Sequence, residues 1–130
     1  MTLLRRVLYL LAALWAITGL VLAIVPGLAL SIAGATVQPE RVWMRLLGIV
    51  LVTLAMLAVL MAQKIEEVWW WAWAFVVEKA AITSFAILKA ALFPTDAAPW
   101  FWWAIAAANL ALTGALLWAL GRAGREQPPA

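Results

Sequence analysis

The chain has 130 residues, of which 68% are hydrophobic and only 12% are charged. Soluble globular domains carry roughly twice as many charged residues and fewer apolar ones, so this composition excludes that class. The net charge of +3 comes from residues that flank long apolar stretches, which indicates membrane orientation rather than nucleic-acid binding.

Cysteine and histidine are both missing from the sequence. Their absence excludes disulfides, thiol nucleophiles, imidazole bases and the usual axial ligands of haem. Zinc sites lose their two commonest donors for the same reason. We therefore expect neither a metal nor a cofactor.

Three stretches contain no charged residue, namely 7–25, 46–62 and 97–121. A hydrocarbon core of roughly 30 Å needs about 20 helical residues, so each stretch can span it, the second with help from 42–45. A fourth candidate, 68–93, carries three charges. Because the runs are continuously apolar rather than alternating, helices are favoured over a barrel. The sequence predicts an all-α fold: a transmembrane four-helix bundle, antiparallel, with both termini on the same side.

The first helix is expected at about 4–25, and the breaker pair Pro26-Gly27 ends it. Two arginines precede this run and residues 21–23 resemble a signal-peptide cleavage site. We favour a retained helix, because the run continues past that site and carries a stripe of small residues suited to helix packing. The stripe comprises Ala12, Ala16, Gly19 and Ala23.

The segment 26–40 is apolar but too short for another crossing, so it is expected to be a loop or a short interfacial helix. The second helix is expected at 41–63. Pro39 suits the first turn of a helix, and the carboxylate of Glu40 is favourable beside the positive end of the helix dipole.

The third helix is expected at 67–93, directly after a tight polar turn, and the fourth at 98–121. Thr95 or Asp96 can cap the fourth helix, since hydroxyl and carboxylate oxygens accept hydrogen bonds from its first N–H groups. The tail 122–130 is polar and proline-containing, and we expect it to be disordered. Residues 1–121 then form a single transmembrane domain.

Lysine and arginine predict the orientation. Five lie at the end of the bundle that holds both termini and the turn between the second and third helices: Arg5, Arg6, Lys64, Arg122 and Arg125. Three lie at the opposite end: Arg41, Arg45 and Lys89. The positive-inside rule therefore predicts cytoplasmic termini. Nine of the ten Trp residues fall near a predicted helix end, as in aromatic belts, although such a cluster can also line an aromatic ligand site or enclose a cation.

Two adjacent charges, Glu78 and Lys79, fall near the middle of the third helix. A charge at this depth costs about 2.5–3.5 kcal/mol, so it needs a partner or a function. Helix registers bring further polar groups to similar depth, although Asn109 is about a turn farther out and Arg45 needs a helix tilt to reach Glu78. The candidate intramembrane polar site comprises Glu78, Lys79, Asn109, Thr53, Thr113 and Arg45.

Three interpretations of this polar set are open. It can be a structural cluster that satisfies its own charges, or a protonatable or ligand-binding site in a cavity. It can also lie at the membrane boundary, if the helix limits are misplaced. One Glu, one Lys and one Asn without a nucleophile or a metal site define no reaction, so we do not expect an enzyme.

Several short motifs carry a family resemblance: Val25-Pro26-Gly27, Trp43-Met44-Arg45-Leu46-Leu47-Gly48, Glu78-Lys79 and Asn109. With them the chain resembles a group of small bacterial four-helix membrane proteins, distantly similar to DoxX-like proteins. The resemblance implies the four-helix fold and a bacterial inner (plasma) membrane. DoxX-like proteins are associated with quinone-linked respiratory systems, but the missing His and Cys argue against a direct redox role here.

The sequence thus favours a non-enzymatic accessory or interaction component of the bacterial inner membrane. The alternative is a small proton-coupled transporter, or a lipid- or quinone-binding protein, that uses the Glu78–Lys79 site. Expected partners are the lipid bilayer, a second copy or a membrane-complex partner, and a small hydrophobic or cationic ligand. We expect no nucleic-acid partner.

Overall fold

The computed structural model describes residues 1–35, 41–92 and 98–126. Within these ranges the chain is α-helical, apart from one short 3-10 helix and a few turn or connecting residues, which confirms the predicted all-α character. Four helical segments are long and apolar enough to cross a membrane: Thr2–Ile24, Arg41–Gln63, Ile65–Ala91 and Trp100–Glu126. The chain therefore has the character of a multi-pass membrane protein.

The first half of the chain contains α1 (Thr2–Ile24), α2 (Pro26–Ala33) and α3 (Arg41–Gln63). The segment expected to be a loop or a short helix is thus helical over α2, and its residues 36–40 lie outside the described part. Pro26 occupies the first turn of α2, where its missing N–H removes no helical hydrogen bond. Gly34 ends α2 in the left-handed conformation, with φ of 63°.

Replacing Gly34 with alanine should destabilise the protein. A left-handed backbone costs a residue with a side chain about 1–2 kcal/mol, and the new Cβ would also lie 3.1 Å from the Cβ of Ala98. Gly27→Ala is the matched control, because its Cβ would meet only the Arg41 side chain at 3.8 Å. Unfolding by denaturing detergent, followed by circular dichroism, measures both variants, and equal stabilities would contradict the role of Gly34.

The third helix, predicted at 67–93, is interrupted near its start in the structure. The chain instead forms α4 (Ile65–Val68), the 3-10 helix η1 (Trp69–Ala72) and α5 (Trp73–Ala91). The backbone leaves helical geometry at Val68, where φ is −125° and ψ is 15°. Bulky aromatic side chains lose rotamer freedom against the preceding helical turn, and three consecutive Trp residues follow this break. The predicted end of this helix and the proposed caps Thr95 and Asp96 lie outside the described residues.

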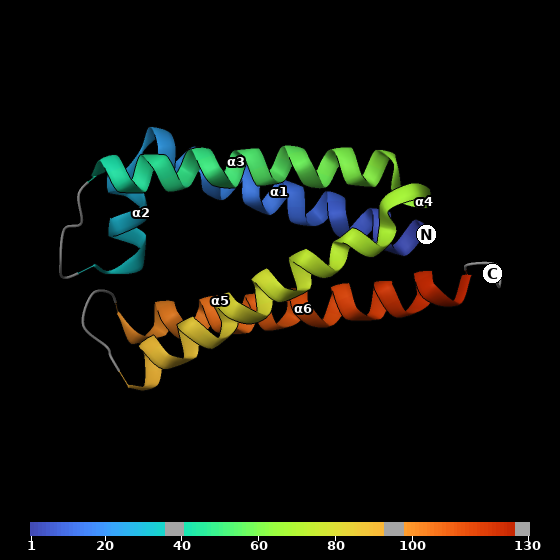
Figure 1. Cartoon of the computed structure of the whole chain (residues 1–130). Coiled ribbons are helices and arrows are strands. Elements are labelled where there is room, and N and C mark those ends of the chain that lie inside the picture. Colours follow the sequence, from blue (N-terminus) through green and yellow to red (C-terminus); the bar gives the residue numbers. More distant parts are fainter. Residues whose placement is uncertain (36–40, 93–97, 127–130) are drawn as a thin grey trace.

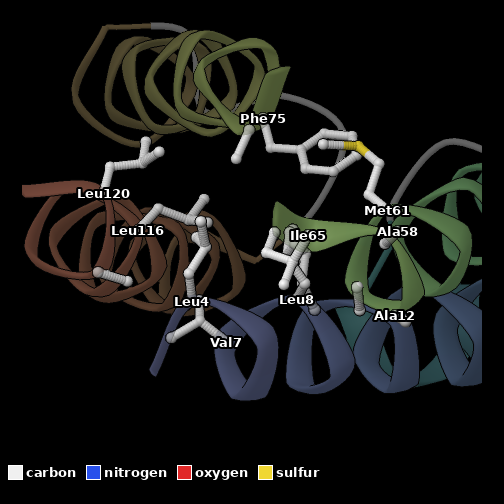
Figure 2. Close-up of a cluster of buried hydrophobic side chains, with 14 of the residues drawn as sticks. Leu4, Val7, Leu8, Ala12, Ala58, Met61, Ile65, Phe75, Leu116 and Leu120 are labelled. Atoms are coloured by element: carbon white, nitrogen blue, oxygen red, sulfur yellow. The ribbon is translucent and has the colours of Figure 1, made fainter. Parts of the chain in front are cut away.

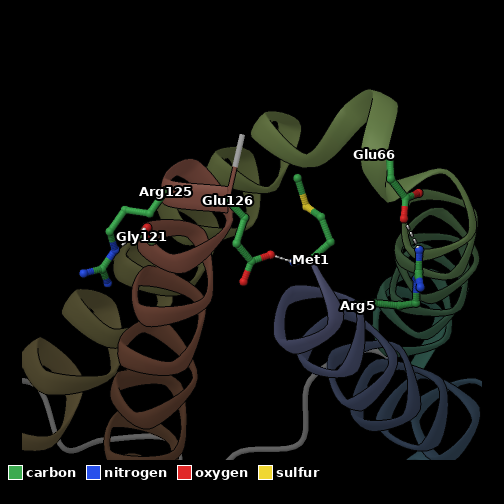
Figure 3. Close-up of polar contacts among 6 residues, drawn as sticks. All are labelled: Met1, Arg5, Glu66, Gly121, Arg125 and Glu126. Atoms are coloured by element: carbon green, nitrogen blue, oxygen red, sulfur yellow. Dashed lines mark hydrogen bonds and ion pairs between the residues drawn. The ribbon is translucent and has the colours of Figure 1, made fainter. Parts of the chain in front are cut away.

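The last helix, α6 (Pro99–Glu126), also differs from the prediction. It continues past residue 121, so residues 122–126 are helical and not part of a disordered tail. Three contacts account for the extension: Ala123 is buried in the core, the Arg125 side chain donates to the Gly121 carbonyl at 3.2 Å, and Glu126 pairs with the Met1 ammonium (Figure 3). Residues 127–130 lie outside the described part.

The helices form two pairs. α1 packs along α3, α5 packs along α6, and α1 also contacts α6 (Figure 1). The largest fully buried side chains all belong to one core cluster: Leu4, Leu8, Leu11, Ile65 and Leu116. Figure 2 shows Leu4, Leu8, Ile65 and Leu116 where the pairs meet. At the same end Arg5 pairs with Glu66 at 2.6 Å (Figure 3). α3 thus lies mainly against α1 rather than along α5.

α1 and α3 cross at two glycines. A Cβ on Gly19 would lie 2.6 Å from the Gly48 carbonyl oxygen, and a Cβ on Gly48 would lie 2.5 Å from the Gly19 carbonyl oxygen. The two backbones are therefore in direct contact, as small residues permit in membrane helix pairs. Two members of the small-residue stripe noted in the sequence, Gly19 and Ala23, lie at this contact. A Cβ on Gly48 would lie 2.6 Å from the backbone nitrogen of Ala23.

Candidate functional site

The charged pair on α5 is split between the interior and the surface. Lys79 is buried at 6% exposure, and its Nζ lies 3.4 Å from Oε2 of Glu78. The Glu78 side chain is 31% exposed, although its Oε2 is buried and accepts no hydrogen bond from the described residues. Adjacent helical residues do not face one another, so the two long side chains meet by curving toward each other. The ammonium is enclosed, whereas the Glu78 side chain is partly exposed at the surface of α5.

The second neighbour of Lys79 is an aromatic ring on another helix. Its Nζ lies 4.7 Å from the ring centroid of Trp15 on α1. Trp15 is itself buried and meets the Phe75 ring edge to face, with centroids 5.1 Å apart. A desolvated cation over an indole face gains about 2 kcal/mol or more. Lys79 therefore joins the α5–α6 pair to the α1–α3 pair.

Trp15 is not among the site residues predicted from the sequence. The available signal was its position: it is the one Trp that is far from any predicted helix end, at mid-helix depth. A Trp at that depth does not belong to an aromatic belt, since its indole N–H is away from the headgroups. A lone Trp and a lone Lys at similar depth on different helices thus predict a cation–π contact.

Thr83, Asn109 and Thr113 each donate a hydrogen bond within their own helix. Thr83 donates to the Lys79 carbonyl at 2.8 Å and Thr113 donates to the Asn109 carbonyl at 2.7 Å. Asn109, also buried, donates from Nδ2 to the Ile105 carbonyl at 2.8 Å. These bonds to the residue four positions earlier satisfy donors that lipid would leave unpaired. None of them reaches the Glu78 carboxylate.

The two candidate residues on α3 do not join the pair. Thr53 is exposed and donates to the Ile49 carbonyl at 3.0 Å, and Arg45 is also exposed. The expectation that Thr53 lies beside Glu78 assumed that helices adjacent in sequence pack along each other. α5 packs along α6 and reaches α1 through Lys79, so α3 is not its neighbour at this depth.

Within the described residues no three His, Cys, Asp or Glu side chains come together in a way that could hold a metal ion. No family model, curated protein or solved structure matches the chain. The chemistry of the site therefore rests on its own geometry. That geometry holds one enclosed cation between a carboxylate and an indole, and leaves the Glu78 side chain partly exposed.

Proposed function

We propose that the chain is a non-enzymatic accessory or interaction component of the bacterial inner membrane, with both termini in the cytoplasm. The observation that carries the proposal is the enclosure of Lys79 between Glu78 and Trp15. Its charge is used to hold α5 against α1, and the neighbouring hydroxyl and amide groups are used within their own helices. Polar groups that pair with other groups of the same chain support the fold instead of acting on a substrate.

The interaction role is supported by the outer face of α6. This helix is the least buried of the four spans. Lipid-facing positions usually carry large apolar residues, whereas small residues permit close approach of another helix. Exposed positions in the middle of α6 include Ala104, Ala107, Ala108, Ala111 and Gly114. A second copy or another membrane protein fits this face.

The test is photo-cross-linking in native membranes. A photoreactive residue at Ala111 should give one discrete protein product, whereas the same residue at Ile17, exposed on α1, should give none. The variant Glu78→Gln with Lys79→Met should keep the Ala111 product at more than half its yield, because both changed side chains act inside the chain. A product absent at Ala111, or lost in this folded variant, would overturn the proposal.

A second candidate function is proton-coupled transport, favoured by the 31% exposure of the Glu78 side chain in the middle of a span. A carboxylate on a partly exposed side chain can exchange a proton more readily than an enclosed ammonium can. Proteoliposomes that contain a pH-sensitive dye measure the proton flux driven by a gradient of a lipophilic cation such as ethidium. Glu78→Gln alone should abolish this flux, and an unchanged flux would remove the transport hypothesis.

A further inference from the structure

A second feature of the molecule is an apolar groove of about 530 Å³ between α3 and the Trp-rich start of the third span. Leu57 and Met61 line it from α3. The opposite wall consists of Trp70, Trp71, Trp73, Ala74 and Phe75. All three indoles are about half exposed, so the groove opens to the surroundings and is not part of the packed core.

Lys64 is the turn residue between α3, which forms one wall of the groove, and the segment that leads to the other wall. The Lys64 N–H donates to the carbonyls of Leu60 and Met61, each at 3.2 Å, which fixes it to the end of α3. Its carbonyl accepts from the N–H groups of Glu67 at 3.0 Å and Val68 at 3.2 Å, directly before the Trp wall. Lys64 is exposed and makes no ion pair with any described residue. An exposed cation therefore lies in the turn between the end of α3 and the segment that leads to the Trp wall, next to the residues that line the groove.

The surrounding charge is positive at this end of the bundle, where Met1 and the end of α6 also lie (Figure 1). It carries five cationic side chains, namely Arg5, Arg6, Lys64, Arg122 and Arg125, against the carboxylates Glu66, Glu67 and Glu126. Two of these carboxylates are occupied, since Glu66 pairs with Arg5 and Glu126 with the Met1 ammonium (Figure 3). Glu67 is the remaining anion beside Lys64.

Cations and half-exposed indoles at one end of a spanning bundle are typical of the headgroup level of a membrane. An indole N–H donates to phosphate or ester oxygens while the ring stays in apolar surroundings. A groove of 300–1,000 Å³ with apolar walls and a few polar groups at its mouth is typical of a ligand site. The ligand chemistry that matches these features is a phosphate joined to a long hydrocarbon chain.

We propose that this groove binds one anionic phospholipid, with an acyl chain between α3 and the Trp wall and its phosphate at Lys64. This phospholipid differs from the surrounding bilayer lipids because both a lysine and indole N–H groups bind it. The Glu78–Lys79 pair takes no part in this site, so the proposal is independent of the proposed function.

Native mass spectrometry of the full chain, released from detergent with added phosphatidylglycerol or phosphatidylcholine, tests the site. The wild type should retain one phosphatidylglycerol about fivefold more tightly than one phosphatidylcholine. Both lipids carry a phosphate, and this preference is expected when one lysine lies beside a headgroup with a net negative charge. Lys64→Gln should remove this preference. Ala74→Phe, which fills the groove from an exposed position, should weaken the first bound molecule of either lipid at least fivefold.

Two matched controls make the result specific. Arg122→Gln removes a cation at the same end of the bundle, and Ala91→Phe adds a ring to an exposed position at the opposite end of α5. Both should bind lipid as the wild type does, and circular dichroism checks that all four variants are folded. An equal loss of preference in Lys64→Gln and Arg122→Gln would overturn the proposal. Equal lipid retention in Ala74→Phe and Ala91→Phe would also overturn it, as would a wild-type chain that retains neither lipid.

Discussion

Gly48→Val should lower the free energy of unfolding by roughly 3 kcal/mol, at the upper end of the cost of overpacking. The first added carbon alone would lie 2.5 Å from the Gly19 carbonyl oxygen and 2.6 Å from the Ala23 nitrogen. These neighbours are backbone atoms, so no side-chain rotation relieves the clash. The crossing of α1 and α3 must widen, which separates the packed faces of both helices.

Gly114→Val is the matched control, because a Cβ at this position on α6 meets no heavy atom within 4 Å. Both glycines lie inside long helices, so differences in helix propensity cancel to first order. Unfolding of the purified chain in mixed micelles, followed by Trp fluorescence and circular dichroism, measures the two free energies. Equal losses in the two variants would show that the Gly19–Gly48 contact does not hold the pair.

The second large effect is expected at the charged pair. Glu78→Gln should cost about 2 kcal/mol, because it leaves the ammonium of Lys79 enclosed without a counter-charge. This is below the usual cost of breaking a buried ion pair, since the Glu78 side chain is 31% exposed. The variant Glu78→Gln with Lys79→Met should recover to within about 1 kcal/mol of the wild type, as the thioether keeps a favourable contact with the Trp15 ring.

The same unfolding assay on Glu78→Gln, on Lys79→Met and on the double variant completes a thermodynamic cycle. A positive coupling, with the double variant more stable than Glu78→Gln, is the expected result. Additive losses would mean that Lys79 and Glu78 act separately. Trp15→Leu in the same background then separates the ring contact from the ion pair, because it removes the indole face and leaves both charges in place.

The positions of the long helices could be predicted from the sequence because apolar runs with charged or proline-containing ends mark the limits of a span. The second helix was predicted at 41–63, and α3 runs over Arg41–Gln63. The break at Val68 was not predicted, because apolar character does not distinguish an α-helical from a 3-10 turn in a Trp-rich segment. The extension of α6 to Glu126 depends on contacts with Met1, which are invisible in local composition.

The candidate site was predicted in part. The placement of Glu78 and Lys79 in the middle of a span follows from counting residues along a helix. Their partners depend on which helices are neighbours, and the assumption that sequence neighbours pair selected Thr53 in place of Trp15. Helix periodicity identifies which face of a helix is buried, but it does not identify the helix that covers that face.

The division into two helix pairs has a consequence for the order of assembly during synthesis. α1 and α3 share the Gly19–Gly48 contact, and both precede α5 in the chain. Because chains are synthesised from the N-terminus, the first pair can close before α5 leaves the ribosome. Trp15 is then already in the membrane when Lys79 arrives. Lys79 can therefore contact the Trp15 ring as soon as α5 packs against α1, and this contact lowers the free-energy cost of burying the charge.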